Sequence, residues 1–265
     1  MSGILALGAY VPERVMTNAD FEAYLDTSDE WIVTRTGIKE RRVAAEAEYT
    51  SDLAFKAVED ILRRHPGALE GVDAVIVATN TPDALFPDTA ALVQARFGLK
   101  AFAYDLLAGC PGWIYALAQA HALVEAGLAQ KVLAVGAEAL SKIIHWKNRL
   151  YMNGREVFKF AVRVMNTATL EAIEKAGLTP EDIRLFVPHQ ANLRIIDAAR
   201  ERLGLPWERV AVNVDRYGNT STASIPLALK EAVDAGRIRE GDHVLLVSFG
   251  AGLTWAAAVL TWGGA

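Results

Sequence analysis

Three short motifs place a cysteine, a histidine and an asparagine at turns that end strand-like runs. Cys110 stands in Ala-Gly-Cys-Pro-Gly at the start of an apolar helix, His189 in Pro-His-Gln-Ala-Asn, and Asn219 in Gly-Asn-Thr-Ser. Open α/β sheets hold their ligands where strands end and helices begin, so all three residues lie in a suitable context. A thiol nucleophile with an imidazole and an amide donor predicts an acyl-transfer site.

Each of these residues also has an ordinary structural interpretation. A lone cysteine is usually a small buried side chain, His189 could be a satisfied core histidine, and Asn219 could be a turn residue. A helix N-terminus lowers the pKa of a thiol, so we expect Cys110, just before Pro111 at the first helical position, to be reactive. The Phe-Gly-Ala-Gly turn at 249–252 is by default a tight β-connection, but its amides could complete an oxyanion hole beside Cys110.

Composition limits the class of protein. The 265 residues are 52% hydrophobic and 22% charged, which predicts a globular chain with a sizeable core and one or two domains. A net charge of −5 argues against a general nucleic-acid surface, and one cysteine excludes an intramolecular disulfide framework and fits a reducing cytosol. No apolar run approaches the roughly 20 residues that span a bilayer. We therefore expect a soluble cytoplasmic protein without nucleic-acid or membrane partners.

Metal and dinucleotide chemistry find no support in the sequence. The five histidines and the single cysteine form no ligand spacing. No glycine-rich phosphate-binding motif follows a strand.

The chain contains two βα units in matching order, one in each half. In the first half a helix (51–64) leads to a buried strand from Ala74, a strand that precedes Cys110, a helix (113–126) and a strand (131–138). The second half repeats this order with a helix (157–176), strands ending at His189 and near Asn219, a helix (225–235) and a strand (243–252). Strands that are apolar on both faces favour mainly parallel sheets covered by helices. The active site is then expected where the two halves join.

At these residues the chain resembles the β-ketoacyl-acyl-carrier-protein synthase III family of the thiolase-like superfamily. The resemblance covers nearly the whole length and rests on Thr27–Val43, the Cys110 turn, Asn153–Phe158, Val187–Asn192, Gly218–Pro226 and Phe249–Trp255. It implies an α/β thiolase-like fold in which two duplicated βα halves, 1–146 with the nucleophile and 147–265 with the histidine and asparagine, form layered α-β-α-β-α sheets. It also implies a homodimer.

The resemblance implies the decarboxylative Claisen condensation that initiates type II fatty-acid synthesis. Cys110 would take the acyl group of a short acyl-CoA, most simply acetyl-CoA, as a thioester. Malonyl-acyl-carrier protein would then lose carbon dioxide while His189 and Asn219 donate hydrogen bonds to its thioester carbonyl. The amides of Cys110 and Ala251 would stabilise the tetrahedral oxyanion. The products would be acetoacetyl-carrier protein, CoA and carbon dioxide, with no resident cofactor.

Substrate contacts are also carried over from the family. Trp31 would stack on the CoA adenine and Arg35 would meet its phosphates, although Trp31 could simply pack on a neighbouring helix. Phe86 would cross the dimer interface to cap the acyl pocket. A basic rim for the acidic carrier protein would include Arg194 and Lys159, which could equally be solvated charges. The pantetheine tunnel would be lined by Met152, Gly154, Phe158, Ala191, Asn192 and Ile195, which could equally be ordinary core.

The sequence departs from the family between Trp146 and Lys147. The family continues there for several tens of residues, through the last strand of the first half and the first strand of the second. Either the natural protein carries this segment and the 265 residues leave it out, or the deletion is real. We favour the first account, because losing central strands would expose apolar faces and unpaired edges.

Two other functions stay open at this stage. A related Cys-His-Asn condensing enzyme could use a longer or branched starter, make polyketides or form hydroxymethylglutaryl-CoA, and a starter-chain specificity profile would distinguish it. A non-catalytic acyl- or carrier-protein-binding homologue is the alternative if the deletion is real. The intact Cys110, His189 and Asn219 argue against that second alternative.

Overall fold

The computed structural model describes residues 2–143 and 152–263, and its elements alternate between strands and helices. The first half contains β1 (Arg14–Thr17), α1 (Asn18–Glu22), α2 (Asp29–Thr36), β2 (Glu40–Val43), α3 (Thr50–Arg64), β3 (Ala74–Ala78), α4 (Thr89–Arg96), β4 (Phe102–Leu106), α5 (Gly112–Glu125), β5 (Val132–Gly136) and α6 (Leu140–Ile143). The second contains α7 (Gly154–Lys175), β6 (Ile183–Pro188), α8 (Leu193–Arg202), α9 (Val214–Tyr217), α10 (Ser224–Asp234), β7 (His243–Gly250) and β8 (Thr254–Thr261).

Each half contributes one three-stranded sheet. The first sheet has the order β4-β3-β5 and is parallel throughout. The second has the order β6-β7-β8, with β6 parallel and β8 antiparallel to β7. The expectation of mainly parallel pairing is therefore confirmed for three of the four strand pairs in these two sheets.

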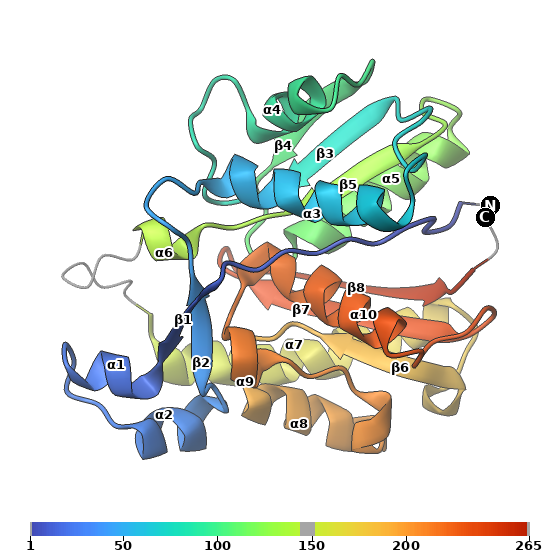
Figure 1. Ribbon diagram of the computed structural model, residues 1–265. Coiled ribbons are helices and arrows are strands. Elements are labelled where there is room, and N and C mark those ends of the chain that lie inside the picture. The colour runs from blue at the N-terminus through green and yellow to red at the C-terminus, as the bar shows by residue number, and fades with distance from the viewer. Residues whose placement is uncertain (1, 144–151, 264–265) are drawn as a thin grey trace.

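Alternating side chains along the strands build a layered core. On β3, Val75 and Val77 pack with α3 and α4, whereas Ile76 faces Ala116 of α5. On β7, Leu246 packs with residues of α5 and α10, whereas its neighbours Leu245 and Val247 pack with α7 and α8. Helices α5 and α10 thus form a shared central layer between the two sheets, with α3 and α4 outside one and α7 and α8 outside the other (Figure 1). This is the layered α-β-α-β-α architecture that the sequence predicts.

The strand expected before Asn219 is absent. Residues 210–212 form a single bridge, between Val210 and Phe186, and α9 follows at once. The reason is the buried Gln190 side chain, whose Oε1 accepts from the backbone N–H groups of Asn213 and Val214 at 2.9 and 3.2 Å. Those donors are used by a side chain and cannot extend a ladder.

Residues 14–43 lie against the opposite half of the chain. β1 and β2 form a small antiparallel sheet below the first one, and α2 approaches α8 (Figure 1). The backbone N–H of Lys39 donates to the carbonyl of Asp215 at 2.9 Å, and the Arg42 guanidinium lies 5.7 Å from the Tyr217 ring centre. The expected boundary at Trp146 and Lys147 lies outside the described residues, so the division at that point stays a prediction.

Candidate active site

Cys110 lies in the turn between β4 and α5. Gly109 adopts a φ of +65°, and its backbone N–H donates to Asn80 Oδ1 at 3.1 Å. Helix α5 begins at Gly112 with Pro111 as its N-cap, one residue later than the sequence suggested. The turn therefore presents the thiol at the start of the central helix, on the edge where the first sheet's strands end.

The expected low pKa of Cys110 is wrong for this structure. Burial raises the pKa of the thiol, because the charged thiolate loses hydration, and the nearby Glu138 charge raises it further. Hydrogen bonds from Ser221 and from the cysteine's own backbone act in the opposite direction without overcoming burial. Cys110 therefore carries its proton until something removes it.

His189 follows β6 and is almost completely buried. Its backbone N–H donates to the carbonyl of Val247 at 2.8 Å, and its ring lies edge-on to Phe249 with 5.4 Å between centres. Its Nδ1 is buried and has no hydrogen-bond partner among the residues that the structure describes. Burial lowers the pKa of His189 to about 3, so the imidazole is neutral at physiological pH. A neutral imidazole whose Nδ1 has no partner suits the role of a hydrogen-bonding group better than that of a charged imidazolium that acts as a general acid.

Asn219 lies in the turn between α9 and α10. Its Oδ1 accepts a hydrogen bond from the backbone N–H of Ser221 at 2.9 Å. Ser221 has a φ of 51°, the left-handed region that a non-glycine residue rarely occupies. In that conformation its hydroxyl lies 3.5 Å from Cys110 Sγ. The Asn219 turn of the second half thus reaches the nucleophile of the first.

The turn between β7 and β8 packs directly on the cysteine turn. A Cβ on Gly250 would lie 2.7 Å from the backbone nitrogen of Cys110, and a Cβ on Gly109 would lie 3.4 Å from the nitrogen of Ala251. Both positions therefore need glycine. The backbone N–H groups of Cys110 and Ala251, expected to form the oxyanion hole, lie on neighbouring turns.

Sequence reasoning missed a partly buried polar network beside Cys110. Asn80 follows β3 and Glu138 follows β5, and the Glu138 carboxylate accepts from Asn80, Thr81, Ser221 and Thr222. The available signal was a polar residue two positions after each buried strand, close to the signal that identified His189, which follows its strand directly. Glu138 is the one ionisable group of this network, and burial raises its pKa.

Two of the expected CoA contacts lie together on the surface. Trp31 and Arg35 occupy successive turns of α2, with the guanidinium 5.9 Å from the indole centre, and the Trp31 side chain is 57% exposed. Asn192 caps α8 and donates to the carbonyl of Arg35 at 2.9 Å, which joins α2 to the His189 turn. This juxtaposition is compatible with a ligand that passes from α2 towards the histidine.

The expected pantetheine residues divide into exposed and packed ones. Met152 is exposed, and its Cε would lie 4.0 Å from a Cβ added at Gly154. Gly154 is exposed too, and Asn192 caps α8. The remaining three residues, Phe158, Ala191 and Ile195, pack into the core around α7 and α8, so a tunnel wall at these positions stays a prediction.

The expected carrier-protein residues and the dimer residue lie on the surface. The Arg194 guanidinium lies 5.2 Å from the Phe158 ring centre, and Lys159 pairs with Glu156 at 2.8 Å. Half of the expected basic rim therefore already has an acidic neighbour. Phe86 is 90% exposed beside an equally open Leu85, a contiguous apolar pair of the kind that interfaces cover.

A cavity of about 1210 Å³ lies between the halves, apart from the thiol. Residues 2–12, α3, α5, β5 and β8 contribute to its lining, and Asn219 and Glu138 line it as well. Of the three predicted catalytic residues, only Asn219 lines it in the described part of the chain. This cavity is therefore not a substrate pocket around the thiol.

Two further features concern the described residues alone. No helix among them is long and apolar enough to cross a membrane. Within the same residues, no group of three or more His, Cys, Asp or Glu side chains is placed to hold a metal ion.

Comparisons with known proteins identify close relatives. A family model described as 3-oxoacyl-[acyl-carrier-protein (ACP)] synthase III matches residues 104–153, and its C-terminal counterpart matches residues 173–262. The chain is 47% identical to β-ketoacyl-[acyl-carrier-protein] synthase III of Deinococcus deserti, over 99% of this chain and 91% of that one. The corresponding protein of Caldanaerobacter subterraneus is 45% identical over 98% of each chain.

A solved structure is more similar still. The crystal structure of β-ketoacyl-[acyl carrier protein] synthase III from Thermus thermophilus is 81% identical, with a TM-score of 0.98 and full coverage of both chains. The alignment with the Deinococcus deserti protein spans 320 residues, more than the 265 of this chain. That relative therefore has residues without a counterpart in this chain.

Proposed function

Because the chain belongs to the 3-oxoacyl-[acyl-carrier-protein] synthase III family, whose members are condensing enzymes of fatty-acid synthesis, we propose that Cys110, His189 and Asn219 carry out its reaction. The observation that supports this assignment best is the meeting of three turns. The Ser221 hydroxyl beside Asn219 contacts Cys110 Sγ, Gly250 packs on the Cys110 backbone, and His189 packs on Phe249. Segments far apart in sequence thus meet at the cysteine turn, and Ser221 contacts its sulfur directly.

In the first step, Cys110 Sγ attacks the carbonyl carbon of an acyl-CoA. The tetrahedral intermediate places negative charge on the carbonyl oxygen, and the N–H groups of Cys110 and Ala251 donate to it. Such donors contribute about 3 to 4 kcal/mol each to transition-state stabilisation. Collapse of the intermediate releases CoA and leaves the acyl group on Cys110.

In the second step, malonyl-acyl-carrier protein loses carbon dioxide and its carbanion attacks the acyl-enzyme. Charge develops on the malonyl thioester oxygen, where His189 and Asn219 donate hydrogen bonds. Burial keeps the His189 imidazole neutral, and its one N–H group donates the hydrogen bond. Acetyl-CoA is the simplest starter, and the product is then acetoacetyl-carrier protein.

Substrate recognition follows from the surface residues. Trp31 holds the adenine of CoA by stacking and Arg35 holds its phosphates by charge-assisted hydrogen bonds, a proposal that their proximity on α2 supports. Arg194 contributes to a surface that attracts the acidic carrier protein. Exposed Phe86 caps the acyl pocket of a second copy in a homodimer. The protein acts in the cytoplasm without a resident cofactor.

The test is the intact mass before and after incubation with acetyl-CoA, with Cys110→Ala as control. We expect one acetyl adduct on the wild-type protein and none on the variant. His189→Ala and Asn219→Ala should still take up the acetyl group but lose condensation with malonyl-acyl-carrier protein by at least a hundredfold. No adduct from any short acyl-CoA would contradict the proposal and favour a binding function.

A further inference from the structure

The Ser221 hydroxyl lies between a nucleophile and a partly buried carboxylate. Its Oγ is 3.5 Å from Cys110 Sγ and 3.1 Å from Glu138 Oε1. A hydroxyl has one proton, so it can donate to only one of these atoms at a time. With Glu138 ionised, the charge-assisted bond to the carboxylate is the stronger, and the Oγ lone pairs face the thiol. The arrangement is then a chain from S–H to O–H to carboxylate.

The protein fold holds this chain in place from both halves. Asn219 Oδ1 anchors the left-handed Ser221 backbone, and Thr222 donates to Glu138 at 3.2 Å from the same segment. On the other side, the Asn80 backbone N–H and the Thr81 hydroxyl donate to the carboxylate at 3.2 and 3.0 Å. A non-glycine residue kept at positive φ costs about 1 kcal/mol or more, and such strain concentrates at functional sites.

Among the described residues that contact Glu138 directly or through Ser221, Cys110 is the one that titrates. Asn80 and Thr81 after β3, and Ser221 and Thr222 before α10, carry no charge. The effect of the Glu138 charge on Cys110 is to raise the pKa of the thiol, which shows that the two groups interact. Burial raises the pKa of Glu138 as well, which makes it a stronger base than an exposed glutamate. His189, with a pKa of about 3, is a weak base.

We propose that Glu138, acting through the Ser221 hydroxyl, takes up the thiol proton of Cys110 when the cysteine is acylated. This inference deepens the proposed function and rests on it for the identity of the acyl donor. Ser221 touches the reacting sulfur and is a catalytic residue, whereas Glu138 is a positioning residue that acts through it.

The proton balance of the step is complete. The Cys110 thiol proton passes to Ser221 Oγ while the Ser221 hydroxyl proton passes to Glu138. Sγ forms a bond to the acyl carbon, and the bond from that carbon to the CoA sulfur breaks. The proton returns through Ser221 to the departing CoA thiolate, which leaves as CoA thiol. Cys110 ends acylated and Glu138 ends ionised, as it began.

The test compares acetyl transfer from acetyl-CoA to Cys110 with alkylation of the same thiol by iodoacetamide, both as a function of pH. Alkylation reports how much thiolate is present, and removing the Glu138 charge favours the thiolate, so Glu138→Gln should be alkylated at least as fast as wild type. Acetyl transfer by the protonated thiol needs the relay, so at neutral pH Glu138→Gln and Ser221→Ala should be acetylated at least tenfold more slowly than wild type. The double variant should be no slower than either single variant.

A purely electrostatic role predicts the opposite result. Removing the Glu138 charge would then speed acetyl transfer together with alkylation, and that outcome would overturn the proposal. Glu231→Gln makes the same change in a separate carboxylate network and should be acetylated at the wild-type rate.

Two further controls distinguish a failure of the relay from misfolding of a variant and from a failure of the proposed function. Ser221→Gly removes the hydroxyl while suiting the positive φ, so it tests the relay even if Ser221→Ala is unstable. At high pH all variants should reach the wild-type rate of acetyl transfer within about threefold, because the thiol then ionises without help. If wild type takes no acetyl group from any short acyl-CoA, the proposed function fails, and the relay that rests on it fails too. If wild type is acetylated and the relay variants are acetylated equally fast at neutral pH, the relay alone fails.

Discussion

At the scale of single residues, burial keeps both Cys110 and His189 uncharged. Loss of hydration disfavours the charged form of each group, so it raises the pKa of the thiol and lowers that of the imidazole to about 3. A thiolate–imidazolium pair is therefore not the resting state of this site. The protonated thiol needs a proton acceptor at the moment of attack, and the neutral imidazole serves as a hydrogen-bonding group.

The His189 environment predicts a specific dependence of stability on pH. The folded pKa lies below the usual value of 6.5, so the unfolded chain binds more protons between about pH 3 and 6.5. The contribution to stability is complete above pH 6.5 and is lost as pH falls towards 3. Between pH 7 and pH 4.5, the free energy of unfolding should fall by about 1 to 3 kcal/mol less in His189→Gln than in wild type, as measured by urea unfolding.

The matched control is His65→Gln, which changes an exposed histidine at the end of α3. It should follow the wild-type curve. Equal losses in wild type and His189→Gln would show that the buried imidazole does not titrate as proposed.

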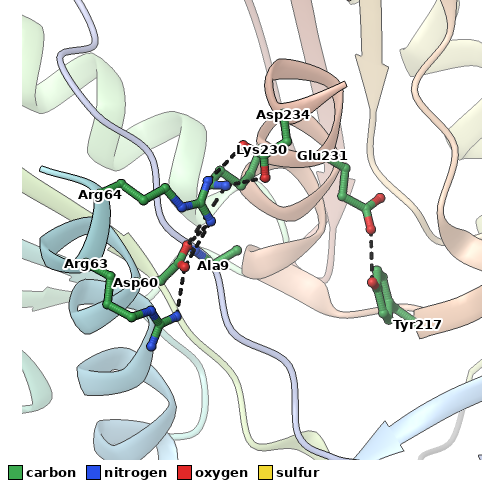
Figure 2. A network of polar contacts seen from close by, with 8 residues as sticks. All are labelled: Ala9, Asp60, Arg63, Arg64, Tyr217, Lys230, Glu231 and Asp234. Carbon is green, nitrogen blue, oxygen red and sulfur yellow. Dashed lines mark hydrogen bonds and ion pairs between the residues drawn. The ribbon is translucent and has the colours of Figure 1, made fainter. Parts of the chain in front are cut away.

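At the scale of elements, Asp60 joins three segments through a buried ionic network. It accepts from the backbone N–H of Ala9 at 3.0 Å and pairs with Arg63 and Arg64 on its own helix, α3 (Figure 2). Lys230 of α10 is almost completely buried and lies 3.9 Å from the same carboxylate. Burial by itself would raise the pKa of Asp60, but these hydrogen bonds hold it below its usual value. The network ties the N-terminal segment to α3 and α10.

Asp60→Ala should destabilise the fold by about 3 kcal/mol, because it leaves the Lys230 ammonium buried without this carboxylate and the Ala9 N–H without an acceptor. Asp234→Asn changes the half-exposed partner of the same lysine and should cost under about 1 kcal/mol. Urea unfolding at neutral pH measures both values. A cost for Asp60→Ala no larger than that for Asp234→Asn would contradict the assigned role.

The β7–β8 turn predicts a second effect at the element scale. In Gly250→Ala, the new methyl group would lie 2.7 Å from the Cys110 nitrogen and must displace one of the two turns. Misplacing a catalytic group by about 1 Å can cost a hundredfold in rate, so acetyl-adduct formation should fall to that extent. Gly67→Ala, whose new methyl group would meet only the Glu70 side chain at 3.5 Å, is the control and should react normally. A normal rate in Gly250→Ala would show that the turn yields without moving the site.

At the scale of the whole molecule, the exposed loop residues Leu85 and Phe86 mark the proposed dimer interface. An exposed apolar pair is costly to hydrate and gains from burial against a second copy. Phe86→Asp should shift the sedimentation profile from dimer towards monomer, whereas Phe102→Asp, at another exposed aromatic residue, should not. A wild-type protein that sediments as a monomer would contradict the homodimer.

The cavity between the halves agrees with a segment missing between Trp146 and Lys147. Residues 2–12 run between α3 and α10 without a strand assignment (Figure 1). They line a cavity of about 1210 Å³. Such a hollow lacks the close packing of protein interiors. We expect the natural protein to exceed 28.7 kDa by intact mass and to yield a peptide that continues beyond Trp146 into residues absent from this sequence. A Trp146–Lys147 bond in an active, folded protein would show the deletion to be real.

The sequence by itself determined the repeated βα order and the identity of the three turns that carry chemistry. Buried strands are continuous apolar runs, amphipathic helices have a regular period, and glycine and polar residues mark the turns between them. For this reason α3, β3, β6 and α10 lie within a few residues of their expected positions. The family was predictable from the motifs around Cys110, His189 and Asn219, and the resemblance to that family implied the layered fold.

Only the tertiary structure decided the protonation state of the site and the role of the hydrogen-bond network that contains Asn80, Glu138 and Ser221. The pKa of a thiol depends on the water and charges around it, and the packing that buries Cys110 beside Glu138 joins residues from both halves. The loss of the strand before Asn219 likewise depends on Gln190, a side chain from another turn. Local sequence patterns carry no information about such contacts, because they form only when distant segments pack together.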